Sequence, residues 1–168
     1  LGAMWPNAVV VDNRPGASAT IGTDIVARSK PDGLTMLLIA DTHAINVSLY
    51  KKLPYDPVKD FSPVILLATA PHIVVVHPSV PANSLKELID HVKSKPGALN
   101  YSSSGPAGTW YVLTEILRAA TGMNLVHVPY KGAGPAMTAL IAGEAQVTIA
   151  PAVTTLAHWR NQRARPLA

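Results

Sequence analysis

The chain of 168 residues is long enough for one domain with a buried core or for two small lobes. Apolar residues make up 48% and charged residues 14%, so the composition excludes a disordered chain. The lack of cysteine excludes disulfides, thiolate metal sites and cysteine catalysis, and no apolar run approaches membrane-spanning length. The net charge of +4 is scattered rather than gathered in a basic stripe interleaved with aromatics, which argues against nucleic acid and suits a small anion.

In the first third of the chain, the pattern predicts two strands and one helix. Residues 8–11 form a β-branched run closed by an Asp-Asn-Arg-Pro-Gly turn. Residues 21–26 place apolar side chains at helical spacing, and a Lys-Pro-Asp-Gly turn ends that helix. Residues 34–40 are a continuous apolar run, typical of a strand covered on both faces in a parallel sheet. Residues 41–63 are expected to be mostly irregular.

The middle of the chain holds two apolar runs and a clearly marked helix. The runs at residues 62–70 and 73–76 are separated by Pro71. They are interpreted either as a crossing from one lobe into another or as one kinked strand. Ser84 and Glu87 then form a capping box, in which each side chain satisfies a backbone N–H of the other.

Strands and helices alternate in the rest of the chain. One helix begins at Thr109 and another has Pro135 in its first turn, while Gly122 and Gly143 suit their left-handed ends. Strands are expected at residues 99–102, 125–128 and 146–150. The alternation predicts an α/β fold with right-handed crossovers and a mostly parallel sheet. The side chains predicted to be buried are Leu85, Leu88, Ile89, Val92, Val112, Leu113, Ile116, Leu117, Leu140 and Ile141.

Two loops are candidates for ligand binding, since each follows a strand and precedes a helix. Ligands of open α/β sheets bind beyond the carboxyl ends of strands, where helix N-termini carry unpaired N–H groups and partial positive charge. Two such ends would hold a carboxylate with backbone donors, hydroxyls and one lysine. The alternative is that both loops are ordinary turns. The candidate residues are Ser103, Ser104, Gly105 and Thr109 on the first loop, and Tyr130, Lys131, Gly132 and Ala133 on the second.

Other chemistry finds weaker support. The chain has no phosphate loop, nucleophile elbow or dinucleotide fingerprint, and its histidines never fall at metal-ligand spacing, so no metal or cofactor is expected. A serine-dependent hydrolase or transferase using residues 102–104 stays an alternative, because the sequence does not show whether serine, histidine and acid meet. His127 is more simply a hydrogen-bonded core histidine. Trp110 and Tyr111 are expected to pack or to line a pocket.

Several motifs together carry a family resemblance. They are Val-Val-Val-Asp-Asn-Arg-Pro-Gly-Ala at residues 9–17, Lys-Pro-Asp-Gly at 30–33, Thr-His-Ala-Ile-Asn at 42–46, Leu-Tyr-Lys-Lys-Leu-Pro-Tyr-Asp-Pro-Val-Lys-Asp-Phe at 49–61, Leu-Asn-Tyr at 99–101, and Val-His-Val-Pro-Tyr-Lys-Gly at 126–132. With them the chain resembles the Bordetella uptake gene (Bug) family, the substrate receptors of tripartite tricarboxylate transporters. The likeness covers nearly the whole chain.

The resemblance implies an α/β fold of the type II periplasmic-binding-protein kind, with mostly parallel sheets, one complete lobe and one truncated lobe. The first lobe is expected at residues 1–70, the second at 71–155, and a return to the first at 156–168. Because relatives are longer, their signal peptide, first strand, glycine-rich first loop and C-terminal part are expected to be missing here.

The resemblance also implies a function. The protein is expected to be periplasmic, not an enzyme, free of cofactors, and to pass a small carboxylate or related anion to membrane transporter subunits. Thr42 and His43 are expected to close over the ligand from the first lobe. Trp110 and Tyr111 stand where relatives tend to have Ser-His, which suggests a more aromatic wall. The incomplete lobe is expected to be covered in a homodimer, by exchange of elements or by more of a longer chain, or else to be disordered.

Overall fold

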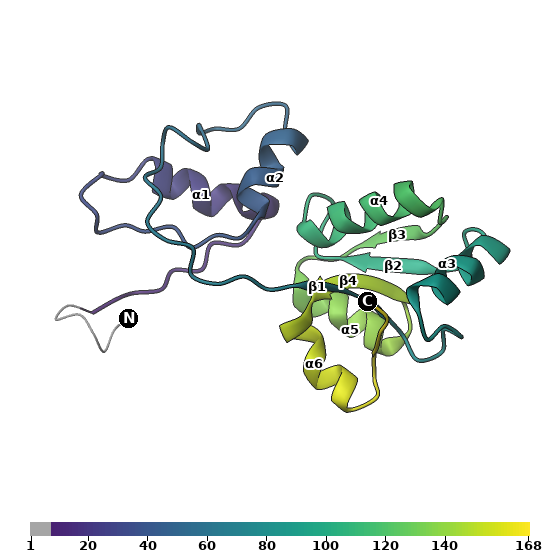
Figure 1. The fold of residues 1–168 in the computed structure, drawn as a ribbon. Helices are drawn as coiled ribbons and strands as arrows, with labels where there is room; N and C mark the ends of the chain where they lie inside the picture. The colour runs from purple at the N-terminus through teal and green to yellow at the C-terminus, as the bar shows by residue number, and fades with distance from the viewer. Residues whose placement is uncertain (1–7) are drawn as a thin grey trace. The chain divides into compact units, whose positions relative to one another are not determined.

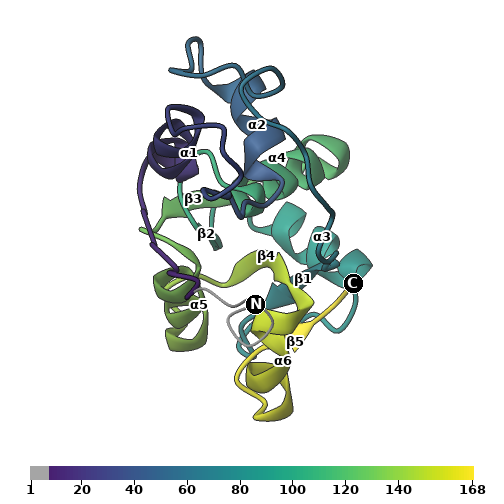
Figure 2. The ribbon, with the colours of Figure 1, turned by 90° about the vertical axis from the view of Figure 1, so that its left-hand side faces the viewer.

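The computed structural model describes residues 8–168. The chain divides into two compact units, Leu1–Pro63 and Val64–Ala168. Figure 1 labels helices α1 to α6 and strands β1 to β4, and Figure 2 labels β5 as well. The boundary at Pro63 lies earlier than residue 70, where the sequence predicted the first lobe to end, and residues 156–168 group with the second unit. None of the helices in this described part is long and apolar enough to cross a membrane.

A five-stranded sheet forms the centre of the second unit, in the order β3-β2-β4-β1-β5. Its strands are β1 (His72–Val76), β2 (Asn100–Ser103), β3 (Val126–Pro129), β4 (Val147–Pro151) and β5 (Arg165–Pro166). β2 runs parallel to both β3 and β4, whereas β1 runs antiparallel to both β4 and β5. The sheet is therefore mixed, although a mostly parallel one was expected. An apolar run indicates that both faces of a strand are covered, but its direction depends on partners distant in sequence.

Helices cover both faces of this sheet, with α3 (Leu85–Ser94) and α4 (Thr109–Thr121) on one and α5 (Ala133–Ala142) and α6 (Ala152–Arg160) on the other (Figure 1). Successive side chains of β1 point to opposite faces. Val74 and Val76 join a core cluster with Leu88 of α3, whereas Val75 joins a second cluster with Leu140 of α5. The unit thus has three layers with a core on each side of the sheet.

Most of the predicted core is confirmed. Leu88, Val92 and Leu140 are fully buried, and five of the other predicted side chains pack, partly buried, against the two clusters. The prediction is wrong for Ile116, which is 60% exposed. The buried side chains of Trp110 and Thr114 define the inner face of α4, and a residue two positions after Thr114 points away from that face.

The ends of the helices follow the signals in the sequence. The Glu87 N–H donates to the Ser84 hydroxyl oxygen at 3.2 Å, and the Glu87 carboxylate accepts from the Asn83 N–H at 2.8 Å. The capping box is therefore present, with its reciprocal bond one residue earlier than in the usual pattern. Gly122 and Gly143 adopt left-handed conformations at φ 71° and 77°, as predicted for the ends of α4 and α5.

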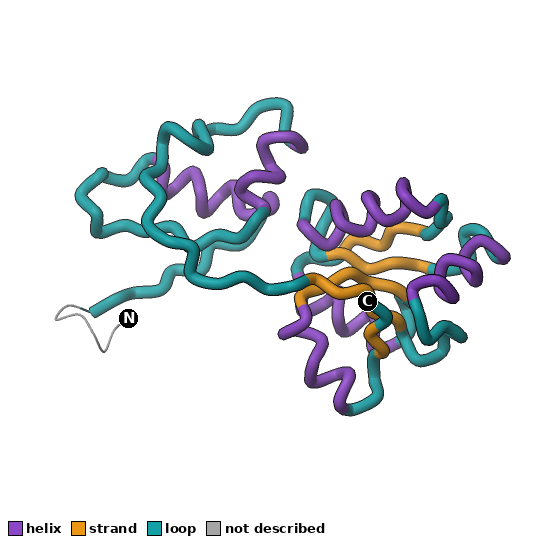
Figure 3. The backbone as a smooth tube through the Cα atoms, in the orientation of Figure 1, coloured by secondary structure: helices purple, strands orange, loops and turns teal. Residues whose placement is uncertain are grey.

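The first unit is built from helices and loops, as Figure 3 shows. It contains the short 3-10 helix η1 (Ala17–Ala19), α1 (Thr20–Ala27) and α2 (Thr42–Leu49). The strands predicted at residues 8–11 and 34–40 are not formed, and neither is a strand over residues 62–70. A strand requires a neighbour for its ladder of hydrogen bonds. Leu34 and Leu38 instead lie exposed, at 85% and 81%.

Helix α2 corrects the expectation that residues 41–63 are mostly irregular. The Asn46 side chain is fully buried, and its amide donates to the Ser18 carbonyl at 2.9 Å. The helix is therefore held by a contact 28 residues away along the chain. Because a local pattern does not show such a contact, reading the sequence missed this helix.

Candidate ligand-binding site

The structure brings the two candidate loops to one edge of the sheet. β2 and β3 are parallel neighbours, and Ser103 pairs with Pro129 where both strands end. The Tyr130 N–H then donates to the Ser103 carbonyl at 3.0 Å. A Cβ atom at Gly105 would lie 3.8 Å from the Tyr130 carbonyl oxygen. The first residues of the two loops are therefore in direct contact.

The Ser103 hydroxyl is turned into the protein. Its Oγ lies 2.7 Å from Nε2 of His127 and donates to the Gly105 carbonyl at 3.0 Å. The Gly105 N–H returns a bond to the same Oγ at 3.3 Å. Since Ser103 is fully buried, its hydroxyl holds the loop from within. The sequence predicted a direct ligand contact for this side chain, and the observed bonds give it a supporting place instead.

Glycine in the first loop is favoured by the geometry of the loop. A Cβ atom at Gly108 would lie 2.6 Å from the Ser104 hydroxyl oxygen, so the Ser104 side chain would have to shift. Gly105 has φ 137°, a conformation open to glycine and strained for other residues. Ser104 is partly exposed, and its side chain lies against the start of α4.

Each loop ends at a helix N-terminus that lacks a side-chain cap. Gly108 is the N-cap of α4 and Gly132, at φ 115°, is the N-cap of α5. The first N–H groups that bond within these helices are those of Val112 and Ala136, to the carbonyls of the two caps. The N–H groups of each first turn, with the positive end of the helix dipole, are therefore directed at the edge where the loops meet.

The second loop carries the remaining predicted residues. Lys131 and Ala133 are exposed, and Gly132 is partly buried. The Tyr130 hydroxyl donates to Glu144 Oε2 at 3.4 Å, and burial, followed by the charge of Glu144, raises the pKa of Tyr130. Helix α5 begins at Ala133, so Pro135 stands in its first turn as predicted.

Beneath the first loop lies a cluster of aromatic and charged side chains that reading the sequence did not assemble. The His127 ring stacks on Tyr101 with centroids 4.7 Å apart and leans against Tyr111 at 4.8 Å. The Tyr101 hydroxyl donates to Glu115, and Arg118 Nη1 donates to the same carboxylate oxygen at 2.6 Å. The available signal for this cluster was the pair of Glu115 and Arg118, three residues apart in a helix with no other charged residue.

This cluster shifts the titration of its members. Burial lowers the pKa of His127, and the Arg118 guanidinium acts in the same direction against the opposing charge of Glu115. Burial alone would raise the pKa of Glu115, but the bonds from Tyr101 and Arg118 outweigh it and lower this pKa. The imidazole is therefore neutral and the carboxylate ionised at neutral pH.

A catalytic triad would have favoured a hydrolase. Ser103 and His127 are in hydrogen-bond contact, but Glu115 directs its bonds to Tyr101 and Arg118. The Ser103 hydroxyl is also buried and bonded to Gly105, which removes it from the reach of a substrate. This pair therefore lacks the arrangement of a serine nucleophile with its base and an orienting acid.

Thr42 and His43, the predicted residues of the first unit, lie at the start of α2. Both are partly buried. The Nε2 atom of His43 lies 2.9 Å from the Pro57 carbonyl oxygen, and its ring stacks with Tyr55 and meets the edge of Phe61. Within its own unit, the His43 ring is therefore held in an aromatic cluster.

Trp110 and Tyr111 differ from each other in position. Trp110 is 4% exposed and belongs to the core cluster with Met137 and Leu140 of α5. Its side chain packs in the core, so the expected aromatic wall is not formed by Trp110. Tyr111 lies against His127, beneath the first loop.

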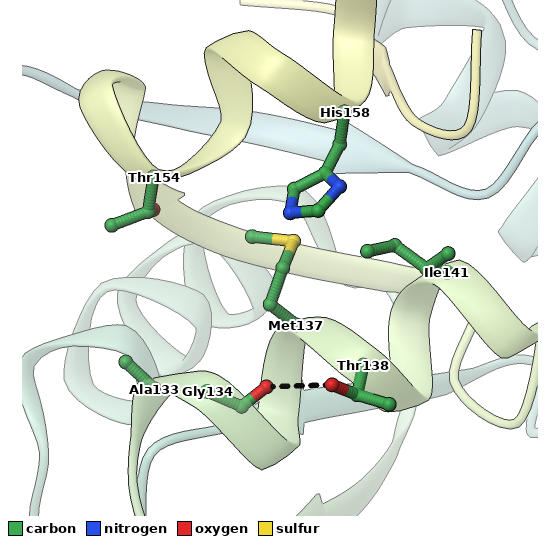
Figure 4. A pocket seen from close by; sticks show the side chains of 7 residues that line it. All are labelled: Ala133, Gly134, Met137, Thr138, Ile141, Thr154 and His158. Carbon is green, nitrogen blue, oxygen red and sulfur yellow. Dashed lines mark hydrogen bonds between the residues drawn. The ribbon is translucent and has the colours of Figure 1, made fainter. Parts of the chain in front are cut away.

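A hollow lies between α5 and α6, which are side by side in both views (Figure 1, Figure 2). It has a volume of about 320 Å³ and shares Ala133 with the second loop. Figure 4 shows His158 of α6 and Met137 of α5 directed toward each other across it, and the Thr138 hydroxyl bonded back to the Gly134 carbonyl at 3.1 Å. No pattern in the sequence predicted this hollow.

Comparison with known proteins identifies the family from the sequence. The model of the tripartite tricarboxylate transporter family receptor matches residues 3–168. Protein BugT of Bordetella pertussis is 35% identical over 162 residues, which are 95% of this chain and 50% of BugT. The chain thus spans about half the length of the curated relatives it matches.

Solved structures agree with this assignment. R. palustris Rpa4515 with adipate has a TM-score of 0.93 and 33% identity, covering 99% of this chain and 56% of that chain. The periplasmic binding protein BugD has a TM-score of 0.87 and 32% identity, covering 96% and 54%. MatC from Rhodopseudomonas palustris with bound malate has a TM-score of 0.81 and 30% identity, covering 91% and 52%. The predicted α/β periplasmic-binding-protein fold is confirmed, and the chain belongs to the receptor family of tripartite tricarboxylate transporters.

Proposed function

We propose that this chain is part of a solute-binding receptor that captures a small carboxylate. The observation that carries the proposal is the contact between the two loops at Ser103 and Tyr130. It directs two helix N-termini without side-chain caps to the same edge of the sheet. Such termini favour an anion through their N–H groups and dipoles. The relatives with adipate and malate support a dicarboxylate in particular.

The proposed contacts divide between side chains and backbone. Ser104, which is partly exposed, and Thr109, which is 7% exposed at the start of α4, supply hydroxyl groups. The first turn of α4 supplies N–H groups. The second loop supplies the second set of contacts, in which the exposed Lys131 adds a positive charge. This set consists of Tyr130, Lys131, Gly132 and Ala133. Ser103 and Gly105 hold the first loop in shape. Thr42 and His43 remain proposed contacts from the first unit.

The wider setting is also a proposal. Relatives are periplasmic binding proteins, which supports a periplasmic location and a membrane transporter as the partner that receives the solute. Binding and release of a carboxylate require no bond-making chemistry and no cofactor. The proposed function is therefore not enzymatic, and the buried Ser103 is consistent with this.

Isothermal titration calorimetry with adipate and with malate tests the proposal. Binding of at least one diacid, and none of the neutral hexanediol, is the expected result. Lys131→Ala should weaken that binding about two- to fivefold, the effect typical of one exposed charge. Lys95→Ala, an exposed lysine that precedes β2 instead of following it, should leave affinity unchanged. Equal affinity for diacid and diol, or Ser103-dependent turnover of an activated ester, would contradict the proposal.

A further inference from the structure

His127 occupies the centre of the cluster beneath the first loop. It stands on β3, and its ring lies between Tyr101 of β2 and Tyr111 of α4. The charged groups that face it are Glu115 and Arg118, both on α4. Its Nε2 atom reaches the Ser103 hydroxyl at 2.7 Å. The ring is thus fixed on two faces, and one of its nitrogen atoms is directed at the loop.

We propose that His127 is a positioning residue, which holds the two ligand loops in their binding geometry through Ser103 without touching the ligand. The inference rests on the proposed carboxylate-binding function of these loops. Ser103 connects both of them, since its side chain bonds to Gly105 and its carbonyl accepts from Tyr130. A group that fixes Ser103 therefore restrains the first loop directly and the second through one backbone bond.

As part of the proposal, we assign the proton of the ring to Nε2. The Ser103 hydroxyl has one proton, which it donates to the Gly105 carbonyl. Oγ is then the acceptor toward His127, so Nε2 carries the hydrogen. Burial lowers the pKa of His127 and favours this neutral ring with a single N–H. A neutral Nε2–H tautomer is the species that completes the three bonds around Ser103.

Four variants separate positioning from simple packing. His127→Phe keeps an aromatic ring between the two tyrosines and removes the donor. His127→Gln removes the ring and offers an amide N–H to Ser103. Ser103→Ala removes the acceptor. Val92→Ala, on the buried face of α3, is the matched control, because it lowers stability without changing a residue of the loops.

The first measurement needs no ligand. Amide hydrogen exchange at Gly105 and Tyr130 should be faster in His127→Phe and Ser103→Ala than in the wild-type chain, by about tenfold for one lost hydrogen bond. His127→Gln and Val92→Ala should keep exchange at these two amides close to the wild-type rate. Nitrogen NMR of the His127 ring should show the proton on Nε2. Unchanged exchange in His127→Phe, failure of His127→Gln to restore the rate, or a proton on Nδ1 alone would overturn the proposal.

The second measurement uses adipate and malate. For whichever acid the wild-type chain binds, His127→Phe and Ser103→Ala should each weaken affinity about five- to twentyfold, and the double variant should be no weaker than either. His127→Gln and Val92→Ala should stay within about threefold. Additive losses in the double variant would refute coupling through Ser103. If the wild-type chain binds neither acid, the proposed function fails, and the exchange rates alone still decide the role of His127.

Discussion

The backbone N–H of Tyr130 donates to the carbonyl oxygen of Ser103 at 3.0 Å, at the point where the two neighbouring strands β2 and β3 both end. This bond continues the ladder of the sheet by one step into the loops. Because the Ser103 side chain is bonded to Gly105 as well, a disturbance of either loop is transmitted to the other. The two loops are therefore expected to behave as one unit in ligand binding.

Gly105→Ala tests this coupling. At φ 137° a Cβ atom is strained, and the residue is buried, so we expect a loss of about 1–3 kcal/mol in unfolding free energy and a clear loss of diacid affinity. Gly97→Ala is the control, since Gly97 also has a positive φ of 74° but lies before β2, with its nearest contact at 4.0 Å. It should lower stability without changing affinity. Denaturant unfolding and calorimetry measure both, and an unchanged affinity in Gly105→Ala would contradict the coupling.

Local signals in the sequence predicted the helices of the second unit well. The capping box at Ser84 and the left-handed glycine at the end of α4 act within one helical turn, so they are visible in the sequence itself. The positions of the two loops also followed from the order of strands and helices. The connectivity of a βαβ unit determines at which edge of the sheet its strands end. The alternation of apolar runs in the sequence predicts this connectivity.

Features that depend on distant partners could not be predicted in the same way. The antiparallel direction of β1 is set by β4, more than 70 residues later, and the apolar run of β1 fits either direction. Residues 34–40 have the composition of a strand, but composition does not supply the neighbour that a strand needs. Helix α2 depends on the bond from Asn46 to Ser18, which its own residues do not reveal.

In the candidate site, too, features set by local sequence were predicted and features set by distant residues were not. The loops were found, but the inward direction of the Ser103 hydroxyl was not, because it depends on His127 from a different strand. Glu115 and Arg118 are one helical turn apart and were visible as a pair. Their connection to Tyr101, and through it to His127, required the three-dimensional structure.

Glu115→Gln should destabilise the second unit. The substitution removes the charge that pairs with Arg118 at 2.6 Å and accepts from the buried Tyr101 hydroxyl. We expect a loss of about 1–2 kcal/mol in unfolding free energy, or about 2–8 °C in the midpoint of thermal unfolding. Asp90→Asn, which removes an exposed pair with Lys86, is the matched control and should leave the midpoint unchanged. Equal shifts of the unfolding midpoint in the two variants would show that the Glu115 pair stabilises the protein no more than an exposed ion pair does.

Stability should depend on pH through His127. Burial lowers its pKa in the folded state, so above the unfolded value of about 6.5 both states are neutral and stability is complete. As pH falls below about 6.5, the unfolded chain gains a proton that the folded chain resists, and stability declines until the lowered folded pKa is passed. His127→Gln, which has no titrating ring, should show a flatter profile in this window.

Urea unfolding at several pH values measures this profile. The Glu115 carboxyl, whose pKa is also lowered, loses its stabilising charge only below the ordinary carboxylate range, so its effect falls at lower pH. The two windows are therefore separable in one titration. A wild-type curve that coincides with that of His127→Gln between neutral pH and the carboxylate range would contradict the assignment.

The first unit should drive self-association of the chain. Val10, Leu34 and Leu38 are each more than 80% exposed, and apolar surface of this kind is rarely left in contact with water by a stable monomer. Residues 34–40 have the composition of a strand but form none, and such a segment adds a second attraction, since it can pair with a copy of itself. Size-exclusion chromatography with light scattering should therefore report a mass that rises with concentration. Leu34→Glu with Leu38→Glu should lower that mass toward the monomer, whereas Ile116→Glu, at an exposed large apolar side chain of α4, should not. A monomer at every concentration would show that this surface is tolerated or covered within one chain.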